Sequence, residues 1–332
     1  MLYLSCHSVA EYDEVKLFNE IDIDVFSHGA YLDPTKPEDD ARPSLSIKPN
    51  KKLINLARKN PKENMSKEFL DNFNVIFSHW KPEWLYNNWN KIKDKICILR
   101  TNGQSSFSNE VMISEMRKEG LKIVRYSPFE KTIPYYAGED VIIRFYKDPD
   151  EFNNWNGEVS QVITVGQNLE ERKAFCNFDA FLAATEGFPR KVYGNDNENL
   201  GDLAESNISY DRLKQVLRDS RVFFYTGTYP ASYTLGFIEA MMTGIPIVAI
   251  GYKLGNAPFL SEQCTYEIPF IIRNGDNGFW NDNIDDLRDW IKTLLNSKEI
   301  AEKIGQAGRQ TAINLFGKDK IKKQWEDFFN RL

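Results

Sequence analysis

The segment 229–249 combines features that suit a nucleotide-diphosphate site. It predicts a loop, a helix that begins after Ser and Thr residues, a glycine that ends the helix, and a buried strand. A helix N-terminus offers unpaired N–H groups and the positive end of the helix dipole, so it can bind a diphosphate. Glu239, further along the helix, can accept hydrogen bonds from a ribose diol. The residues predicted to offer backbone N–H groups are Ser232, Tyr233, Thr234 and Leu235.

Both features have a second interpretation. Ser and Thr at a helix start are also ordinary caps. Glu239 lies between Ile238 and Ala240 on an otherwise apolar helix, where a carboxylate needs a partner. A ribose and a structural salt bridge both satisfy that need.

This stretch resembles the donor-site signature of the GT-B glycosyltransferases, especially the retaining family 4 group. The signature has two glutamates separated by seven residues, and the second precedes Ala-Met and a later Gly and Pro. Glu239 precedes Ala240-Met241, and Gly244 and Pro246 follow. Ala231 stands at the place of the first glutamate, so the departure concerns the part of the signature that contacts the sugar.

A second segment carries the same resemblance. The family has Val-Gly-Arg after a strand, then five intervening residues and a lysine, and the two cations clamp the diphosphate. This chain has Gly166, then Gln167 in place of the arginine, and Lys173 in place of the lysine. A lysine in the first turn of a helix opposes the helix dipole, which favours an anionic ligand, although simple exposure also accounts for it. The segment 273–279 resembles the family's late Asn-Gly-Phe turn, so the resemblance covers about 160–332 and is weak over 1–150.

Strands alternate with helices along the whole chain, which predicts an α/β fold with parallel sheets. The resemblance implies two Rossmann-like domains facing a cleft. We expect an acceptor-binding domain at 1–157, a nucleotide-sugar domain at 158–317, and a C-terminal helix at 318–332 that crosses back to the first domain. Among the individual elements, we expect one helix over 172–185 and a strand over 267–272.

Composition excludes several classes. The chain has 332 residues, 42% of them hydrophobic, and its four cysteines form no Cys-x-x-Cys pair, which argues against a metal cage or a disulfide framework. We find no signal peptide and no transmembrane run, so we expect a cytoplasmic protein, in the host cytoplasm if it is viral. Asp-x-Asp at 22–24 and 148–150 matches the metal motif of GT-A enzymes but lies outside any nucleotide-binding context. We therefore expect no metal and no cofactor beyond the donor substrate.

Candidate acceptor residues come from the first domain. Asn102-Gly103 follows the predicted strand 96–100 and resembles the family's His-Gly pair near the transferred sugar, although an Asn-Gly turn also explains it. His7 and His79 follow other strands, where each contacts an acceptor or is an ordinary loop histidine. The candidate catalytic set is thus Asn102, Lys173 and Glu239.

Charge is unevenly distributed. Between Arg42 and Arg100 there are thirteen Lys/Arg and five Asp/Glu, a surplus of +8 in a chain of net charge −6. Such a surplus suits an anionic partner, although solvated helix faces also account for it. We expect Lys51 and Lys52 to contact acceptor phosphates. The aromatic residues of this stretch, which stack on bases or sugars or else form core, are Trp80, Trp84, Tyr86 and Trp89.

Together these features predict a glycosyltransferase that moves a sugar from a nucleotide-diphosphate sugar to an acceptor hydroxyl, with retention by resemblance. The base and the sugar stay open. One acceptor is a hydroxymethylated pyrimidine in DNA, as for bacteriophage DNA-modifying glycosyltransferases of this general fold. Another is a cell-surface glycan or lipid-linked sugar, with peripheral membrane contact. The other classes are a GT-B epimerase or phosphorylase and a non-catalytic sugar- or nucleic-acid-binding module.

Overall fold

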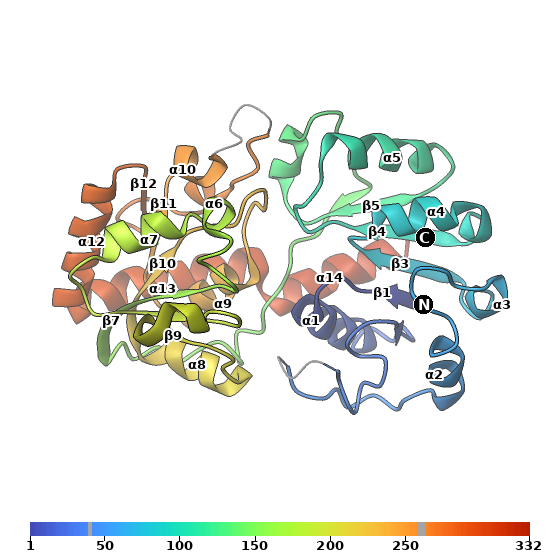
Figure 1. Ribbon diagram of the computed structural model, residues 1–332, viewed down its shortest axis with the longest axis horizontal. Coiled ribbons are helices and arrows are strands. Elements are labelled where there is room, and N and C mark those ends of the chain that lie inside the picture. Colours follow the sequence, from blue (N-terminus) through green and yellow to red (C-terminus); the bar gives the residue numbers. More distant parts are fainter. Residues whose placement is uncertain (39–41, 258–262) are drawn as a thin grey trace. The chain divides into compact units, whose positions relative to one another are not determined.

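The computed structural model describes residues 1–38, 42–257 and 263–332, which form two compact units (Figure 1). Unit 1 comprises Met1–Phe145 and Ile321–Leu332, and unit 2 comprises Tyr146–Lys320. The division falls at 145/146 and 320/321 instead of the expected 157/158 and 317/318. The segment 148–157 belongs to unit 2 because its side chains bond there, as the indole of Trp155 does to the Ser220 carbonyl at 2.8 Å.

Unit 1 is built on a parallel sheet of six described strands in the order β2-β1-β3-β4-β5-β6. The strands form because short apolar runs such as Val75–His79 bury both faces, as parallel strands do. The strands are β1 (Leu2–Leu4), β2 (Phe26–Ser27), β3 (Val75–His79), β4 (Ile96–Arg100), β5 (Lys122–Arg125) and β6 (Val141–Ile142). The helices are α1 (Ser8–Asn19), α2 (Lys51–Ala57), α3 (Lys67–Leu70), α4 (Pro82–Ile92), α5 (Phe107–Lys118) and the 3₁₀ helix η1 (Pro128–Thr132).

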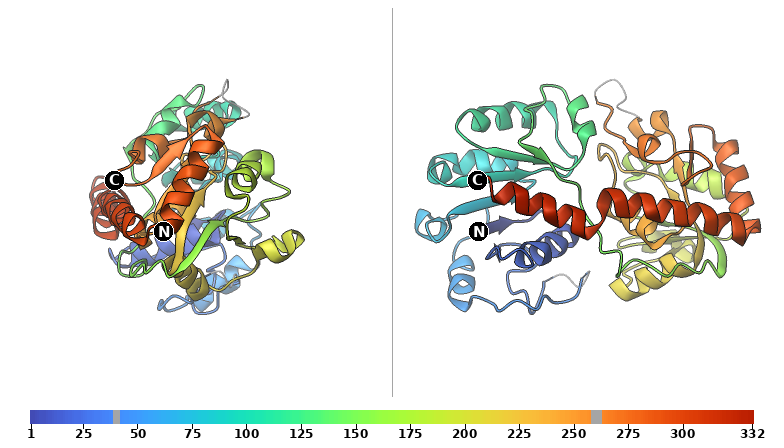
Figure 2. Two further views of the ribbon diagram at one scale, coloured as in Figure 1. Left: turned by 90° about the vertical axis from the view of Figure 1, so that its left-hand side faces the viewer. Right: turned by 180° about the vertical axis from the view of Figure 1, so that it is seen from behind.

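The last helix, α14 (Lys318–Phe329), completes unit 1, as the sequence predicted. Its Trp325 is 1% exposed and packs edge-on against Phe18 of α1, with ring centroids 5.0 Å apart. Phe77 of β3 lies 5.7 Å from the same indole. Figure 2 shows α14 lying across the strands of unit 1. The apolar stripe of this helix is therefore part of the core of unit 1.

Unit 2 holds a second parallel sheet, in which the six described strands have the order β12-β11-β10-β7-β8-β9. The neighbouring strands β10 and β11 are the most buried, and β11 is buried at every position. The strands are β7 (Val159–Val165), β8 (Arg190–Tyr193), β9 (Ala204–Glu205), β10 (Ser220–Tyr225), β11 (Ile247–Ile250) and β12 (Phe279–Asn281). The helices are α6 (Lys173–Cys176), α7 (Phe178–Thr185), α8 (Tyr210–Asp219), α9 (Leu235–Thr243), α10 (Tyr252–Asn256), α11 (Ile268–Ile271), α12 (Ile284–Asn296), α13 (Lys298–Phe316) and the 3₁₀ helix η2 (Glu198–Leu203).

Two element predictions in unit 2 were wrong. The segment 267–272 forms the short helix α11 with Pro269 in its first turn, and the edge strand is β12 instead. The expected helix over 172–185 is broken into α6 and α7 at Asn177, whose left-handed φ of 48° interrupts the helical path. Apolar content alone does not separate a short helix from a short strand.

The predicted α/β class with two Rossmann-like sheets is confirmed by these two units. Throughout the described residues, no helix is both long and apolar enough to cross a bilayer.

Candidate functional site

The loops at the carboxyl ends of the strands of unit 2 contain the residues predicted to bind a donor. Ligands of open α/β sheets bind at this edge. Gly166 directly follows β7, and the chain from 226 to 234 connects β10 to α9. The donor residues expected from sequence thus lie on loops that follow neighbouring strands of one sheet.

Asn197 holds the loops after β7 and β8 together. Its fully buried side chain donates to the carbonyls of Gly166 at 2.8 Å and Gly194 at 2.9 Å, and accepts from the Leu169 N–H at 2.9 Å. The loops approach so closely that a Cβ on Gly194 would stand 2.3 Å from the Gly166 carbonyl oxygen. Gly194 also has a φ of 127°, which favours glycine. The backbone at Gly166 is therefore rigidly positioned.

Helix α9 presents its N-terminus at the same edge. Its N-cap, Thr234, is extended and makes no side-chain capping bond. Leu235 and Gly236, the first two residues of the helix, are partly exposed, and N–H groups at this place in a helix have no partner within it and can bind an anion. Ser232 and Tyr233, by contrast, are buried, and the Tyr233 ring packs on Phe316 at 5.2 Å.

The two loops meet. A Cβ added to Gly236 in the first turn of α9 would stand 3.9 Å from the Cβ of Val165, the last residue of β7. The loop after β10 is also tied to the α6–α7 segment, because the Tyr229 N–H donates to the Phe175 carbonyl at 2.7 Å. Gly166, the α9 N-terminus and the helix that carries Lys173 thus form one constellation within unit 2.

The cations of this constellation are partly committed. Lys173 is half exposed, and its ammonium lies 3.6 Å from a Glu170 carboxylate oxygen. Position 167, where the family has an arginine, carries a neutral glutamine. The Gln167 amide donates to Asp196 at 2.6 Å. Arg172, the N-cap of α6, was not among the predicted residues, and its guanidinium donates to the Gln167 carbonyl at 3.1 Å. Arg172 is a second cation beside the Gly166 loop.

Glu239 is buried and ion-paired. Its carboxylate oxygen lies 2.7 Å from the Lys147 ammonium, and both side chains are almost wholly buried. Of the two interpretations of Glu239, the structural salt bridge is therefore present. One carboxylate can accept several hydrogen bonds, so this pair does not use up its acceptor capacity.

In unit 1, Asn102 and the loop after β1 come together at the carboxyl ends of β1 and β4. The Asn102 amide nitrogen lies 3.5 Å from the Cys6 sulfur. His7 is exposed and caps α1, where its Nδ1 accepts from the Ala10 N–H at 3.5 Å. The Asn102 Oδ1 is buried and has no hydrogen-bond partner among the residues that the structure describes. Asn102 and His7 thus remain at the edge where an acceptor would bind.

His79 does not. It is fully buried, with Nδ1 2.9 Å from the Tyr3 hydroxyl and 3.4 Å from a Glu14 oxygen. Burial, reinforced by the Arg100 charge, holds the pKa of His79 well below its ordinary value. The prediction that His79 faces an acceptor is corrected, because this neutral ring is part of a core network.

The basic segment divides into paired and unpaired cations. Lys51 and Lys52 are exposed at the start of α2, as expected for residues that contact phosphates. The aromatic residues of the segment are mostly committed to packing. Trp89 is 7% exposed, the Trp84 indole donates to the Lys62 carbonyl, and the Tyr86 hydroxyl donates to Glu115 at 3.1 Å.

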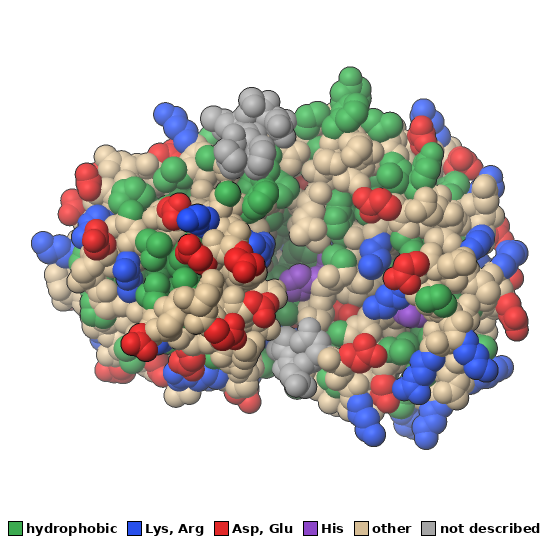
Figure 3. Space-filling view, viewed as in Figure 1, with side chains coloured by type: hydrophobic (Ala, Val, Ile, Leu, Met, Phe, Trp, Pro, Cys, Tyr) green, Lys and Arg blue, Asp and Glu red, His purple; other side chains and the backbone are tan. Residues whose placement is uncertain are grey.

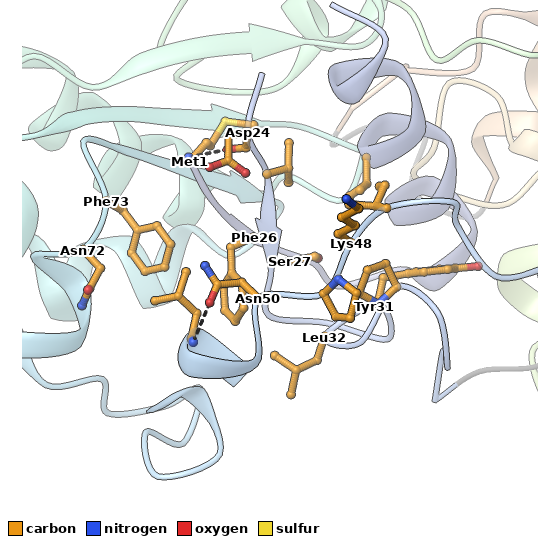
Figure 4. Close-up of a pocket in the computed structure, with 16 residues that line it drawn as sticks. Met1, Asp24, Phe26, Ser27, Tyr31, Leu32, Lys48, Asn50, Asn72 and Phe73 are labelled. Carbon is orange, nitrogen blue, oxygen red and sulfur yellow. Dashed lines mark hydrogen bonds between the residues drawn. The ribbon is translucent and has the colours of Figure 1, made fainter. Parts of the chain in front are cut away.

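One pocket of unit 1 lies away from these loops (Figure 4). Met1 and Phe73, which line it, precede β1 and β3, and Phe26 lies on the edge strand β2. This pocket therefore opens near the amino ends of the central strands, opposite the edge where ligands of such sheets bind. Within the described ranges, no group of three or more His, Cys, Asp or Glu side chains is arranged to hold a metal ion.

Two parallel-sheet units, a C-terminal helix that returns to the first, and an uncapped helix N-terminus beside a glycine loop define the GT-B fold of glycosyltransferases, as predicted. Solved structures show the same fold over the whole chain. Sucrose-phosphate synthase from Thermosynechococcus elongatus is similar over 99% of this chain and 98% of its own, with 15% identity and a TM-score of 0.69. Anabaena HepE, in complex with UDP-glucose, is similar over 100% and 99%, with 14% identity and a TM-score of 0.70.

Among curated proteins, a poly(ribitol-phosphate) alpha-N-acetylglucosaminyltransferase of Staphylococcus aureus (strain COL) is 29% identical over 119 residues. The match covers 35% of this chain and 22% of that protein, so the chain spans about a fifth of the relative's length. No family model matches the chain.

Proposed function

We propose that this chain is a glycosyltransferase that moves a sugar from a UDP-sugar to an acceptor hydroxyl. The observation that carries the proposal is the α9 N-terminus packed beside the end of β7, since it pairs accessible N–H groups with the Gly166 backbone. Similarity to a structure with bound UDP-glucose and to a curated N-acetylglucosaminyltransferase supports a UDP-sugar.

The proposed reaction retains anomeric configuration. The acceptor oxygen forms a bond to the anomeric carbon, the bond from that carbon to the diphosphate oxygen breaks, and the acceptor proton passes to the leaving diphosphate. The protein positions the reactants and stabilises the charge of the leaving group. Leu235 and Gly236 would supply N–H groups, Lys173 and Arg172 positive charge, and Glu239 a ribose contact.

The acceptor is proposed to be anionic and to bind unit 1 near Asn102 and His7. A phosphodiester polymer fits the basic segment, and the matched relative's name specifies such a polymer. Hydroxymethylated DNA, the acceptor expected from sequence, is the second candidate. A neutral glycan does not itself use the basic segment, which would then serve to contact an anionic membrane surface. A cytoplasmic location remains a prediction.

The test is binding and turnover of nucleotide sugars. We expect UDP, UDP-glucose or UDP-N-acetylglucosamine to raise the melting temperature and ADP and GDP to do so less, with slow release of free sugar in the absence of an acceptor. NMR of the product then reports an α or β linkage. Binding without hydrolysis or transfer would indicate a non-catalytic module, and interconversion of sugar isomers would indicate an epimerase. If no nucleotide binds, the proposal is wrong.

A further inference from the structure

The segment around α2 carries a concentrated positive charge. From Pro43 to Lys62 the sequence has six Lys/Arg residues and no Asp or Glu. We name these six residues the cationic ridge: Lys48, Lys51, Lys52, Arg58, Lys59 and Lys62.

The ridge is exposed and unneutralised. Five of its six side chains belong to exposed residues, and Lys62 is half-buried. None of the six forms an ion pair in the part of the chain that the structure describes. Other lysines of the basic segment do, since Lys67 and Lys95 both pair with Asp71, and Lys93 pairs with Glu119. Figure 3 shows the resulting cluster of blue side chains at the lower right, over the region where Figure 1 draws α2.

The start of the ridge lies far from the carboxyl ends of the strands of unit 1. Asn50, the N-cap of α2, and Leu53 line the same pocket as Met1 and Phe73, which precede β1 and β3 (Figure 4). Strand β3 has five residues, and at 3.3 Å per residue it spans about 16 Å. A molecule that touches Lys51 and also presents a hydroxyl near Asn102 must therefore extend at least roughly 15 Å. Only a long acceptor does so.

The ridge also lacks stacking partners. No Phe, Tyr or Trp occurs between Tyr31 and Phe69. Of the tryptophans beyond it, Trp89 is buried in the core, and Trp84 is half-buried with its indole N–H bonded to the Lys62 carbonyl at the end of the ridge. Proteins that bind single-stranded nucleic acids combine cations with aromatic platforms for the bases. The ridge therefore offers charge for repeated phosphates but no row of aromatic platforms for the unstacked bases of a single-stranded nucleic acid.

We infer that the cationic ridge docks a distant stretch of a polymeric acceptor whose units are joined by phosphodiesters and carry no bases, as in a polyol phosphate. The inference rests on the proposed glycosyltransferase function and adds a binding surface apart from the reacting hydroxyl. Because the ridge reaches only long acceptors, affinity should rise with acceptor length, whereas a single acceptor unit should gain nothing from it.

The test compares the wild type with a variant that carries Lys51→Gln, Lys52→Gln, Arg58→Gln and Lys59→Gln. All four side chains are exposed and unpaired, so the fold should be unaffected. The matched control carries Lys118→Gln, Lys292→Gln and Lys303→Gln, which remove exposed cations without ion pairs on α5, α12 and α13. Binding of poly(ribitol phosphate) of defined length is measured at several salt concentrations, beside single-stranded DNA of the same number of phosphates and a single ribitol phosphate unit.

We expect the ridge variant to bind the polymer at least 10-fold more weakly than the wild type does. In a plot of log Kd against log salt concentration, its slope should be smaller in magnitude by about 3, the value for four lost phosphate contacts. Wild type should bind the polymer more tightly than single-stranded DNA of the same number of phosphates at equal salt. The single unit, UDP binding and UDP-sugar hydrolysis should be the same in all three proteins.

Three results would overturn the inference. The ridge is not the docking surface if the ridge variant binds the polymer as tightly as the wild type does. The same holds if the ridge variant and the control lose equal affinity. If the wild type binds DNA more tightly than poly(ribitol phosphate), the proposed class of polymer is wrong. Because UDP-sugar hydrolysis is measured separately, failure of the ridge is distinguished from failure of the proposed function.

Discussion

The Lys147 ammonium lies 2.7 Å from the Glu239 carboxylate, and both side chains are almost wholly buried. Lys147 belongs to the segment by which the chain enters unit 2, and its N–H donates to the Phe316 carbonyl at 3.0 Å, near the point where the chain leaves. The glutamate of the donor signature is thus anchored to the two connections between the units. A ribose contact and a structural role can coexist in this one carboxylate.

Lys147→Met should destabilise unit 2 by about 3–5 kcal/mol, because it leaves the Glu239 charge buried without its cation. The double variant Lys147→Met/Glu239→Leu should recover most of that stability, since an apolar pair needs no compensation. Urea denaturation measures both. If Glu239 also contacts ribose, the double variant will be stable and still bind UDP about 10-fold more weakly. UDP affinity equal to that of wild type in the double variant would limit Glu239 to its structural role.

Lys173→Ala should weaken UDP-sugar binding by about 10-fold, the loss expected for one charge-assisted contact to the diphosphate. Calorimetric titration with UDP measures it. Lys191→Ala, which removes a cation from β8 that donates to the Asp202 carbonyl, is the control. Equal affinities for Lys173→Ala and the wild type would remove Lys173 from the site.

Asn197→Ala should damage the donor site without touching the ligand. It removes the side chain that satisfies the Leu169 N–H and the carbonyls of Gly166 and Gly194, and each buried group left unsatisfied costs about 1–3 kcal/mol. We expect a lower melting temperature and weaker UDP binding. Asn195→Ala changes an exposed neighbour and should do neither. If Asn197→Ala is much less stable but binds UDP as tightly as the wild type does, the loops after β7 and β8 do not contribute to the donor site.

Glu130 should make stability depend on pH. Burial raises the pKa of this carboxyl from 4.5 to about 6, so the folded protein holds its proton more tightly than the unfolded chain. Its contribution is present in full below pH 4.5 and is lost as the pH rises through 6. Relative to wild type, Glu130→Gln should therefore gain roughly 2 kcal/mol of stability between pH 4.5 and 6.5. Glu119→Gln, an exposed control, should show no such trend. If the stability of both variants depends on pH in the same way, Glu130 does not have the raised pKa.

Transfer should need no divalent cation, because a helix end and two basic side chains would stabilise the diphosphate. EDTA should leave the initial rate unchanged. A rate that falls with EDTA and returns with Mg²⁺ or Mn²⁺ would require a metal at the diphosphate.

Local sequence signals were sufficient to predict the parallel sheet of unit 1, the central strands of unit 2 and helix α9, but not the edge strands β9 and β12. The Ser/Thr-rich start and Gly244 mark the ends of α9, and Gly244 adopts the left-handed φ of 93° that a helix end favours. Contacts between distant residues were not predictable. Nothing near Lys147 in the sequence points to Glu239, and Asn197 looks like one turn residue among several. His79 was predicted to face an acceptor for the same reason as His7, namely its place at the end of a strand. It lies instead on a central strand whose surroundings exclude water.

The position of Trp325 also has a consequence during protein synthesis. A ribosome makes all of unit 2 after the first 145 residues of unit 1 and before the helix that completes it. Until Trp325 emerges, the nascent first unit exposes Phe18 and Phe77 where the indole will pack. Domains that fold during synthesis generally do so in order from the N-terminus, but here the second unit can finish first. Trp325→Ala should therefore leave unit 2 folded and increase aggregation through the unsealed first unit, as light scattering during refolding would reveal, whereas the exposed neighbour change Lys323→Ala should not.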